Sequence, residues 1–197
     1  MKALIHAESA KIGHLERHKS IKLSTYGIVF MGTPHQGTDI TLGNLILGIA
    51  SVVIKTNPNL VENLKRDSEL LGDQSRSYLG ISDDFATIYC YETKPIPPFR
   101  EPVGFFCPSA YIVRADMLKV VPYASAVVKG VRNAPAIGIQ KNHKQMVKFS
   151  SNNTKDYQDV SLSVKQMVAE ASDKVRTNWA EWDMLKGEYA LRCNHRF

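Results

Sequence analysis

Cysteine is scarce in this sequence and forms no ligand pattern. The chain of 197 residues holds three cysteines, Cys90, Cys107 and Cys193, and no two of them form a C-x-x-C pair. An odd number without metal-ligand spacing argues against a disulfide-stapled domain and against a zinc site. We therefore expect reduced thiols in an intracellular protein, and neither a metal nor another cofactor.

Long apolar runs are also lacking. The nearest candidate, Leu42–Ile54, is interrupted by glycines, an asparagine and a serine, and a membrane-spanning helix needs about 20 apolar residues. A buried or interfacial helix is the better interpretation, which leaves open a peripheral contact with a membrane. The segment Met1–His14 is too short and too polar for a secretory signal. We expect neither a signal peptide nor a transmembrane span.

The excess of basic residues lacks the concentration of a nucleic-acid-binding protein. The formal net charge is +6, but the lysines and arginines are scattered, as in Lys11–Lys22 and Lys141–Lys148, without an arginine-rich run or an aromatic platform. A solvated basic surface is the simpler explanation, and a nucleic-acid partner is not expected. The 44% of hydrophobic residues is typical of one globular domain with a real core.

Two segments are the clearest strands of a predicted parallel sheet, and several shorter pieces follow them. Ile28–Met31 is a continuous apolar run, Phe85–Tyr91 is rich in aromatic and β-branched residues, and Ala136–Ile139 is one of the short extended pieces further along the chain. Helical patterns separate them, which is the βαβ order of an α/β fold. Three core strands are fewer than the roughly five of a typical sheet. We therefore expect an incomplete sheet.

The first strand ends in a sharp turn. Within Tyr26–Asp39, YGIVFMGTPHQGTD, the residues Gly32, Pro34 and Gly37 bend the backbone at the carboxyl end of the strand. Ligands of open α/β sheets bind at that edge. On local grounds, the rim of an active site and an ordinary strand-to-helix turn both remain open.

Helical segments surround the strands. Met1–Leu15 has helix-favouring composition, and the polar Glu16–Ser24 would connect it to the first strand. Leu42–Leu79 is predicted as a helical excursion in the position of a cap. Thr154–Val175 is the clearest helix, because apolar residues recur at three- and four-residue steps. Arg176–Phe197 shows little periodicity and is expected as a linker or a frayed tail.

Shorter elements are predicted between these. Tyr111–Val113 and Met117–Val121 are short strand candidates, and Ala124–Val128 is a further short extended piece. Asn142–Phe149 is predicted as a short helix that opens on Asn142 and His143.

Two residues occupy positions that carry chemistry in α/β enzymes. Glu92 directly follows the second strand, and His143 follows the last one. An acid and then a histidine is the order in the second half of an α/β-hydrolase triad, where the histidine takes the proton of a serine and the acid orients the histidine. From spacing alone, a surface glutamate and a histidine at a helix start are the simpler interpretation.

Four ordered blocks add a family resemblance. GIVFMGTPHQGTD, FATIYCYETKP, VVPYASAVV and IGIQKNHKQMVKFSS resemble the C-terminal half of the lipase/esterase-like α/β-hydrolases of the serine-active-site-containing protein type. In fungi such domains often precede nucleotide-binding and ankyrin or other repeat modules in large signalling proteins. The resemblance spans Met1 to about Val168. It implies a partial α/β-hydrolase domain over residues 1–175, with a cap-like insertion at about 42–80 and a linker or tail at 176–197.

The resemblance also assigns roles. It implies that Glu92 is the acid and His143 the catalytic histidine, and that His35 lies at the active-site rim in a structural role. Asp83, Asp84 and Asp116 are rival acids, of which Asp116 is the most plausible substitute. The implied activity is ester hydrolysis, with a lipid as one candidate substrate. Association with mitochondrial or endoplasmic reticulum membranes is a further implication.

The expected nucleophile is missing. No G-x-S-x-G elbow occurs in the sequence; the nearest match, Gly80–Asp84, lacks the closing glycine. The oxyanion-hole donors would be absent with it. The first helix also lacks an N-cap, which suggests that upstream sequence is missing. We therefore expect no esterase activity from this chain alone, and an apolar edge on the first strand that is open to another chain.

A non-catalytic interaction module of a signalling or repeat protein is the alternative to an enzyme fragment. The genomic sequence upstream of Met1 separates the two, because it encodes G-x-S-x-G only if the chain is a truncated hydrolase.

Overall fold

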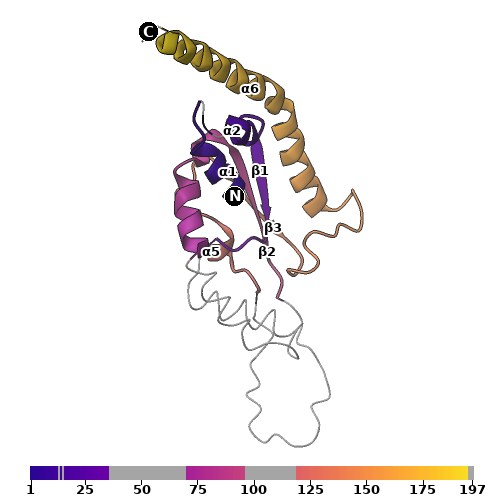
Figure 1. Cartoon of the computed structure of the whole chain (residues 1–197). Helices are drawn as coiled ribbons and strands as arrows, with labels where there is room; N and C mark the ends of the chain where they lie inside the picture. Colours follow the sequence, from indigo (N-terminus) through magenta and orange to yellow (C-terminus); the bar gives the residue numbers. More distant parts are fainter. Residues whose placement is uncertain (13, 15, 36–69, 96–118, 195–197) are drawn as a thin grey trace, which may run out of the picture.

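A three-stranded parallel sheet organises the part of the chain that the computed structural model describes, residues 1–12, 14, 16–35, 70–95 and 119–194 (Figure 1). Its strands, in spatial order, are β1 (Gly27–Met31), β2 (Ala86–Glu92) and β3 (Ala136–Ile139). Both neighbouring pairs are parallel, with Phe30 opposite Tyr89 and Cys90 opposite Ile137. The predicted α/β class and its parallel sheet are confirmed.

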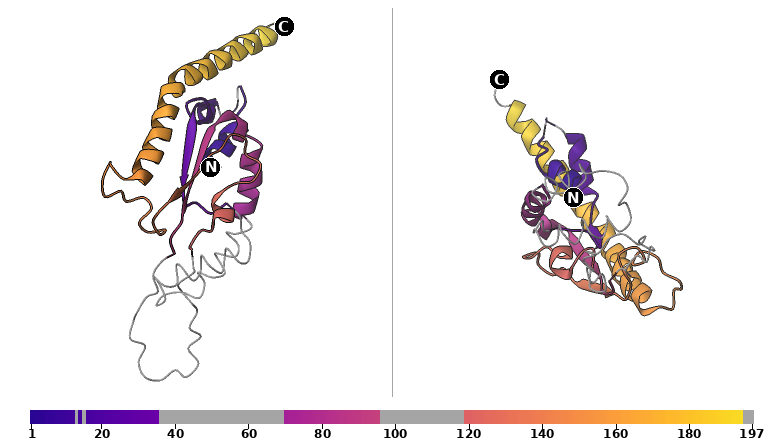
Figure 2. Two further views of the ribbon diagram at one scale, coloured as in Figure 1. Left: turned by 180° about the vertical axis from the view of Figure 1, so that it is seen from behind. Right: turned by 90° about the horizontal axis from the view of Figure 1, so that it is seen from below.

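Helices cover both faces of this sheet. The other described elements are α1 (Lys2–Glu8), α2 (Glu16–Leu23), the 3₁₀ helix η1 (Ser82–Asp84), α5 (Tyr123–Ala126) and α6 (Lys155–Asn194). On one face, Phe30 and Tyr89 pack with Tyr78 from the helical residues 70–79, and on the other Ile88 lies in a cluster that Met167 of α6 covers. Figures 1 and 2 show the sheet between these two layers. Alternating strand residues thus face two separate cores.

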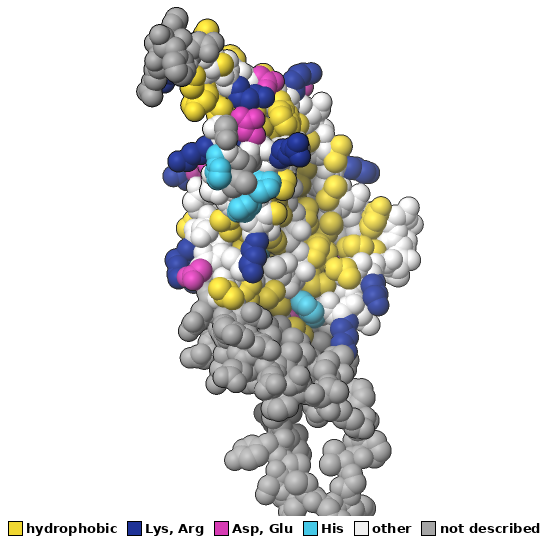
Figure 3. Space-filling model, viewed as in Figure 1, with side chains coloured by type: hydrophobic (Ala, Val, Ile, Leu, Met, Phe, Trp, Pro, Cys, Tyr) yellow, Lys and Arg dark blue, Asp and Glu magenta, His cyan; other side chains and the backbone are white. Residues whose placement is uncertain are grey.

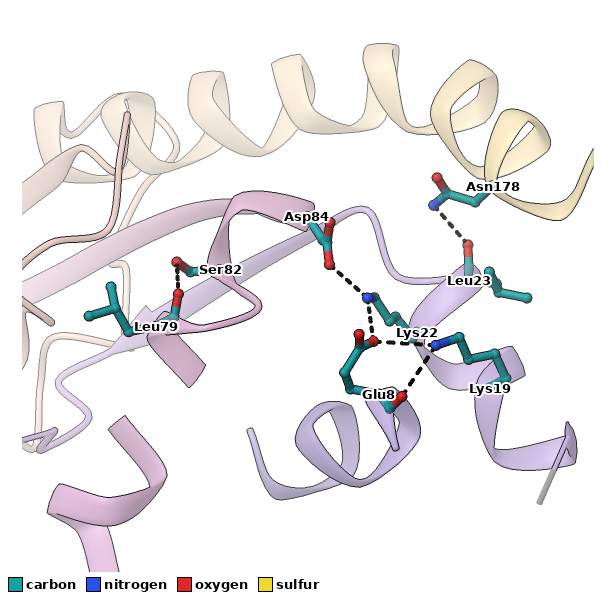
Figure 4. A network of polar contacts seen from close by, with 8 residues as sticks. All are labelled: Glu8, Lys19, Lys22, Leu23, Leu79, Ser82, Asp84 and Asn178. Carbon is teal, nitrogen blue, oxygen red and sulfur yellow. Dashed lines mark hydrogen bonds and ion pairs between the residues drawn. The ribbon is translucent and has the colours of Figure 1, made fainter. Parts of the chain in front are cut away.

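The first helix is shorter than expected, and the predicted connector is itself a helix. The single helix predicted for Met1–Leu15 ends at Glu8, and α2 forms where a polar connector was expected. The chain reverses between them through paired backbone bonds of Lys11 and His14. The charged residues of α2 suggested a loop, but two of them are paired: the Glu8 carboxylate forms ion pairs with the side-chain amines of Lys19 and Lys22 (Figure 4).

The expected tail after Val175 is the second half of α6, a continuous helix of 40 residues. Its inward stripe continues beyond Val175 to Trp182, which is 9% exposed. The side-chain amide of Asn178 donates to the carbonyl of Leu23 at 3.3 Å, and the indole of Trp179 donates to Ser24 at 3.2 Å. Contacts of Asn178, Trp179 and Trp182 therefore hold this part of the helix against the rest of the protein. Because two of these contacts are polar, the sequence shows no continuous apolar stripe here. None of the described helices is long and apolar enough to cross a membrane.

Three short predictions differ from the structure. Ala124–Val128 was expected as an extended piece, but Pro122 precedes a single helical turn there, α5. Residues 119–121 are not a strand, and residues 142–149 form a turn rather than a helix. Tyr111–Val113 and Leu42–Ile54 lie outside the described residues, as does most of the predicted cap.

Candidate active site

Glu92 ends β2 with a fully buried side chain. The alternation of the strand puts Ile88, Cys90 and Glu92 on the same face of the sheet, so the carboxyl group continues an apolar row. Its Oε1 accepts a hydrogen bond from the backbone N–H of Val121 at 2.7 Å. Since a buried polar group without a partner is costly, this bond fixes where the carboxyl group points.

His143 lies in the turn that follows β3. The Asn142 side chain accepts the N–H of Gln145 at 3.1 Å, and the Asn142 carbonyl accepts the N–H of Met146 at 2.9 Å. Met146 is buried in the core beside β2 and β3 and anchors the turn. The imidazole of His143 is consequently held at the sheet edge, with its side chain one-third exposed.

The two side chains meet. His143 Nδ1 lies 3.6 Å from Glu92 Oε1, which is close enough for attraction but longer than a hydrogen bond of about 3 Å. Glu92 Oε2 and His143 Nδ1 are both buried without a hydrogen-bond partner.

Gly32 brings the end of β1 to the same place. Its φ is +59°, a conformation that side chains disfavour, and a Cβ there would lie 2.7 Å from Met146 Sδ and 3.0 Å from His143 Cε1. The backbone just after β1 therefore approaches the imidazole so closely that only glycine fits at position 32. Residues at the carboxyl ends of all three described strands converge on one point.

His35 lies apart from this pair, on the other face of the sheet. It is fully buried, and its ring centroid lies 4.6 Å from that of Phe30 and 5.4 Å from that of Tyr89. Its backbone N–H donates to Ser125 at 2.7 Å, and its carbonyl accepts Ser75 Oγ at 2.5 Å. Burial, and secondly the charged N-terminal amine, lowers the pKa of His35 from 6.5 to about 4. These contacts fit the structural role expected for His35, which stays a prediction.

Two of the rival acids, Asp83 and Asp84, lie far from His143 along the sheet. Asp83 and Asp84 belong to η1, just before β2, and so lie at the opposite edge of the sheet from Glu92. Asp84 forms an ion pair with Lys22 at 2.7 Å, within the network that joins α1, α2 and η1 (Figure 4). Asp116 lies outside the described residues.

Two surface hollows lined by described residues lie away from the acid–histidine pair. One of about 260 Å³ lies between α2 and α6 and includes Lys22 and Trp182, and a wider one of about 860 Å³ includes Tyr26 and Glu170. Both reach Asp84 and Phe85, at the amino edge of the sheet. The pair is assigned from its chemistry and contacts rather than from a cavity.

The structure offers neither a reactive cysteine at Cys90 nor a metal-binding cluster among the described residues. Burial raises the pKa of the Cys90 thiol to about 11, so this cysteine is a poor nucleophile. Within the described ranges, no cluster of three or more histidine, cysteine or acidic side chains could hold a metal ion.

Sequence reasoning named Glu92 and His143, and the structure brings them together. It missed the backbone N–H of Val121 and the approach of Gly32. Gly32 had a visible signal, a glycine directly after a strand, whereas nothing in the local sequence marks Val121 as a donor.

Comparison with known proteins adds no relative: no protein-family model, no curated protein and no solved structure matches this chain.

Proposed function

We propose that this chain supplies the acid and the histidine of a serine-hydrolase-type site for ester hydrolysis, on a partial α/β-hydrolase fold. The observation that carries the proposal is the 3.6 Å approach of Glu92 Oε1 to His143 Nδ1. In such a site the acid keeps the imidazole proton on Nδ1, so that Nε2 can accept the proton of a nucleophile. The family resemblance extends the proposal to a lipid ester and to mitochondrial or endoplasmic reticulum membranes.

The surroundings of the pair support these roles. Glu92 is fully buried and held by Val121, whereas His143 is one-third exposed. The acid is thus the inner, fixed member of the pair, and the histidine is the member that a substrate can reach. With reversed burial, an exposed acid and a buried histidine, the imidazole would be out of reach of a substrate.

A nucleophile is the part that this sequence does not supply, since it holds no G-x-S-x-G. An acid and a histidine alone have nothing to activate. We therefore expect the chain to hydrolyse a short-chain nitrophenyl ester no faster than its His143→Ala variant. Hydrolysis that disappears in His143→Ala would contradict this expectation.

A longer polypeptide gives the positive test. If the sequence encoded upstream of Met1 carries G-x-S-x-G, the extended protein should hydrolyse the ester. His143→Ala should then lower kcat by about 10²-fold or more, with Glu92→Ala also impaired. Full activity of both variants would show that Glu92 and His143 do not take part in the reaction.

An interaction module built on the same scaffold is the second candidate, and the edge of β1 favours it. In the described part of the chain β1 pairs with β2 only, and its sequence GIVFM has no charged residue or proline. Natural edge strands usually carry such residues to prevent pairing with another chain. The bonds from Gly32 to Cys90 and from Ala86 to Tyr26 set the parallel ladder so that the N–H of Val29 points to the outer side.

Val29→Pro tests this candidate directly. Proline removes the outward N–H of Val29 while leaving the inward ladder to β2 in place. If another strand pairs with β1, Val29→Pro should abolish the association in sedimentation velocity, while the control Val29→Ala, which keeps the N–H, should retain it. Equal association of the two variants would exclude strand pairing at this edge.

A further inference from the structure

Basic residues accumulate around His143 without acidic neighbours in the sequence. Residues 119–149 contain six basic side chains and no aspartate or glutamate: Lys119, Lys129, Arg132, Lys141, Lys144 and Lys148. With 19 acidic residues in 197, a stretch of this length would ordinarily include about three. The charge of this region is therefore strongly one-sided.

Four lysines gather on the two loops that carry the acid–histidine pair. The backbone N–H of Lys94, two residues after Glu92, donates to the carbonyl of Lys141 at 3.3 Å. Lys141 in turn donates its side-chain amine to the carbonyl of Lys148. Lys144 directly follows His143. We call Lys94, Lys141, Lys144 and Lys148 the lysine collar; Figure 3 shows Lys and Arg side chains beside a histidine low on the described body.

No acidic side chain among the described residues neutralises the charge of the lysine collar. Within the described ranges none of its four lysines forms an ion pair. Two acids lie near: Glu92 is buried, and Asp156 accepts the backbone N–H of Gln140 at 3.0 Å. Lys94, Lys144 and Lys148 are all exposed. In the described part of the chain, Lys94, Lys144 and Lys148 therefore present positive charge to solvent without an acidic partner.

An exposed aliphatic side chain stands among these charges. Val147 lies in the same turn, between Lys144 and Lys148, and is 55% exposed. The nearby ring of Phe149 is engaged instead, because it packs edge-on against Tyr157 and under the amine of Lys141. Within the described part of the collar, the surface thus offers cations and a small apolar group, and the ring of Phe149 is not free to stack.

We propose that the lysine collar docks the carboxyl edge of the sheet on an anionic lipid surface. Lysines near such a surface bind its headgroups, and an exposed aliphatic side chain between them can enter the interface. A nucleic acid would also bind the lysines, but it would gain little from contact with Val147, because bases stack on aromatic rings. The docked orientation turns the partly exposed side chain of His143 toward the lipid. This surface differs from Leu42–Ile54, and docking does not depend on hydrolysis.

Vesicle sedimentation tests the proposal without any ester. At low salt the protein should sediment with vesicles of phosphatidylcholine and phosphatidylserine, and not with phosphatidylcholine alone. About 1 M salt should release it, because screening then acts within about 3 Å. The double variant Lys144→Glu/Lys148→Glu should lower the partition coefficient by about 25-fold or more, given about fivefold per lysine lost.

A matched control separates the collar from overall charge. Lys165→Glu/Lys174→Glu on α6 makes the same change in net charge on exposed residues and should bind as the parent does. Far-UV circular dichroism verifies that both variants fold. Equal losses in the two variants, no preference for anionic vesicles, or equally tight collar-dependent binding to a DNA duplex would each overturn the proposal.

Discussion

The Glu92 carboxyl group, at the end of β2, approaches the His143 imidazole in the turn after β3 to 3.6 Å. One oxygen of the acid is already held by the N–H of Val121 at 2.7 Å. The other has no partner, and neither has His143 Nδ1. The site is therefore prearranged on the acid side and adjustable on the histidine side. A fixed acid beside an adjustable imidazole suits a histidine that must accept and then donate a proton during a reaction.

Removal of the Glu92 side chain should cost more stability than removal of its charge. Glu92→Ala leaves the buried N–H of Val121 without an acceptor, a loss of about 1–3 kcal/mol, and opens a cavity as well. Glu92→Gln keeps an acceptor at the same place and should cost less. Urea unfolding of the two variants measures the difference, and equal free energies of unfolding would show that the bond to Val121 contributes little.

Gly32→Ala should destabilise the protein by about 2 kcal/mol or more. The positive φ is strained for alanine, and the new methyl would press on Met146 and His143. Gly72→Ala is the matched control, because its Cβ meets nothing within 4 Å and alanine favours the helix by up to about 1 kcal/mol. Thermal unfolding should lower Tm in the first variant and leave it unchanged or raised in the second. A neutral Gly32→Ala would contradict the close approach of β1.

Stability should fall with acidification because of His35. Its pKa is about 4 in the folded protein and 6.5 ordinarily, so between these values the unfolded chain binds the proton more readily. Stability from neutral His35 is thus fully present above pH 6.5 and is lost as pH falls toward about 4, by up to roughly 3 kcal/mol. His35→Phe, which can pack beside Phe30 and Tyr89, should remove this part of the pH dependence. Parallel curves for parent and variant over this window would refute the prediction.

The second half of α6 should contribute to stability through Trp182. This side chain is 9% exposed and covers α2, where the amine of Lys19 lies 5.8 Å from its ring. Trp182→Ala should cost about 3 kcal/mol or more. Leu191→Ala, at a position 63% exposed, should change the free energy of unfolding by less than about 0.5 kcal/mol. Comparable losses in both would mean that Trp182 does not anchor α6.

The sheet was predictable because its strands are local patterns. Ile28–Met31 and Phe85–Tyr91 are short apolar segments between turn signals, and each corresponds to a strand within two residues. The third strand, Ala136–Ile139, was one of several short extended pieces that the sequence offered. The continuation of α6 was not predictable, because Asn178 and Trp179 hold it by bonds to Leu23 and Ser24, which lie 155 residues away. Such contacts leave no periodic trace.

The site divides in the same way. Chain order placed Glu92 and His143 at one edge of the predicted sheet, because the carboxyl ends of parallel strands share that edge. Spacing alone favoured a surface glutamate and a histidine at a helix start, and the family resemblance selected the pair. The donor from Val121 could not be inferred, since a backbone N–H is present at almost every residue and only the tertiary path brings this one to Glu92. The helix predicted for residues 142–149 failed because Asn142 caps a turn that closes on itself and is held by buried Met146.

The most direct test of the acid–histidine pair is the ¹⁵N NMR spectrum of the His143 ring, recorded above the pH at which the imidazole is protonated. If Glu92 orients the histidine, the proton resides on Nδ1, and Glu92→Ala shifts it toward Nε2. The same Nδ1 population in parent and variant, or a parent ring protonated on Nε2, would contradict the central claim.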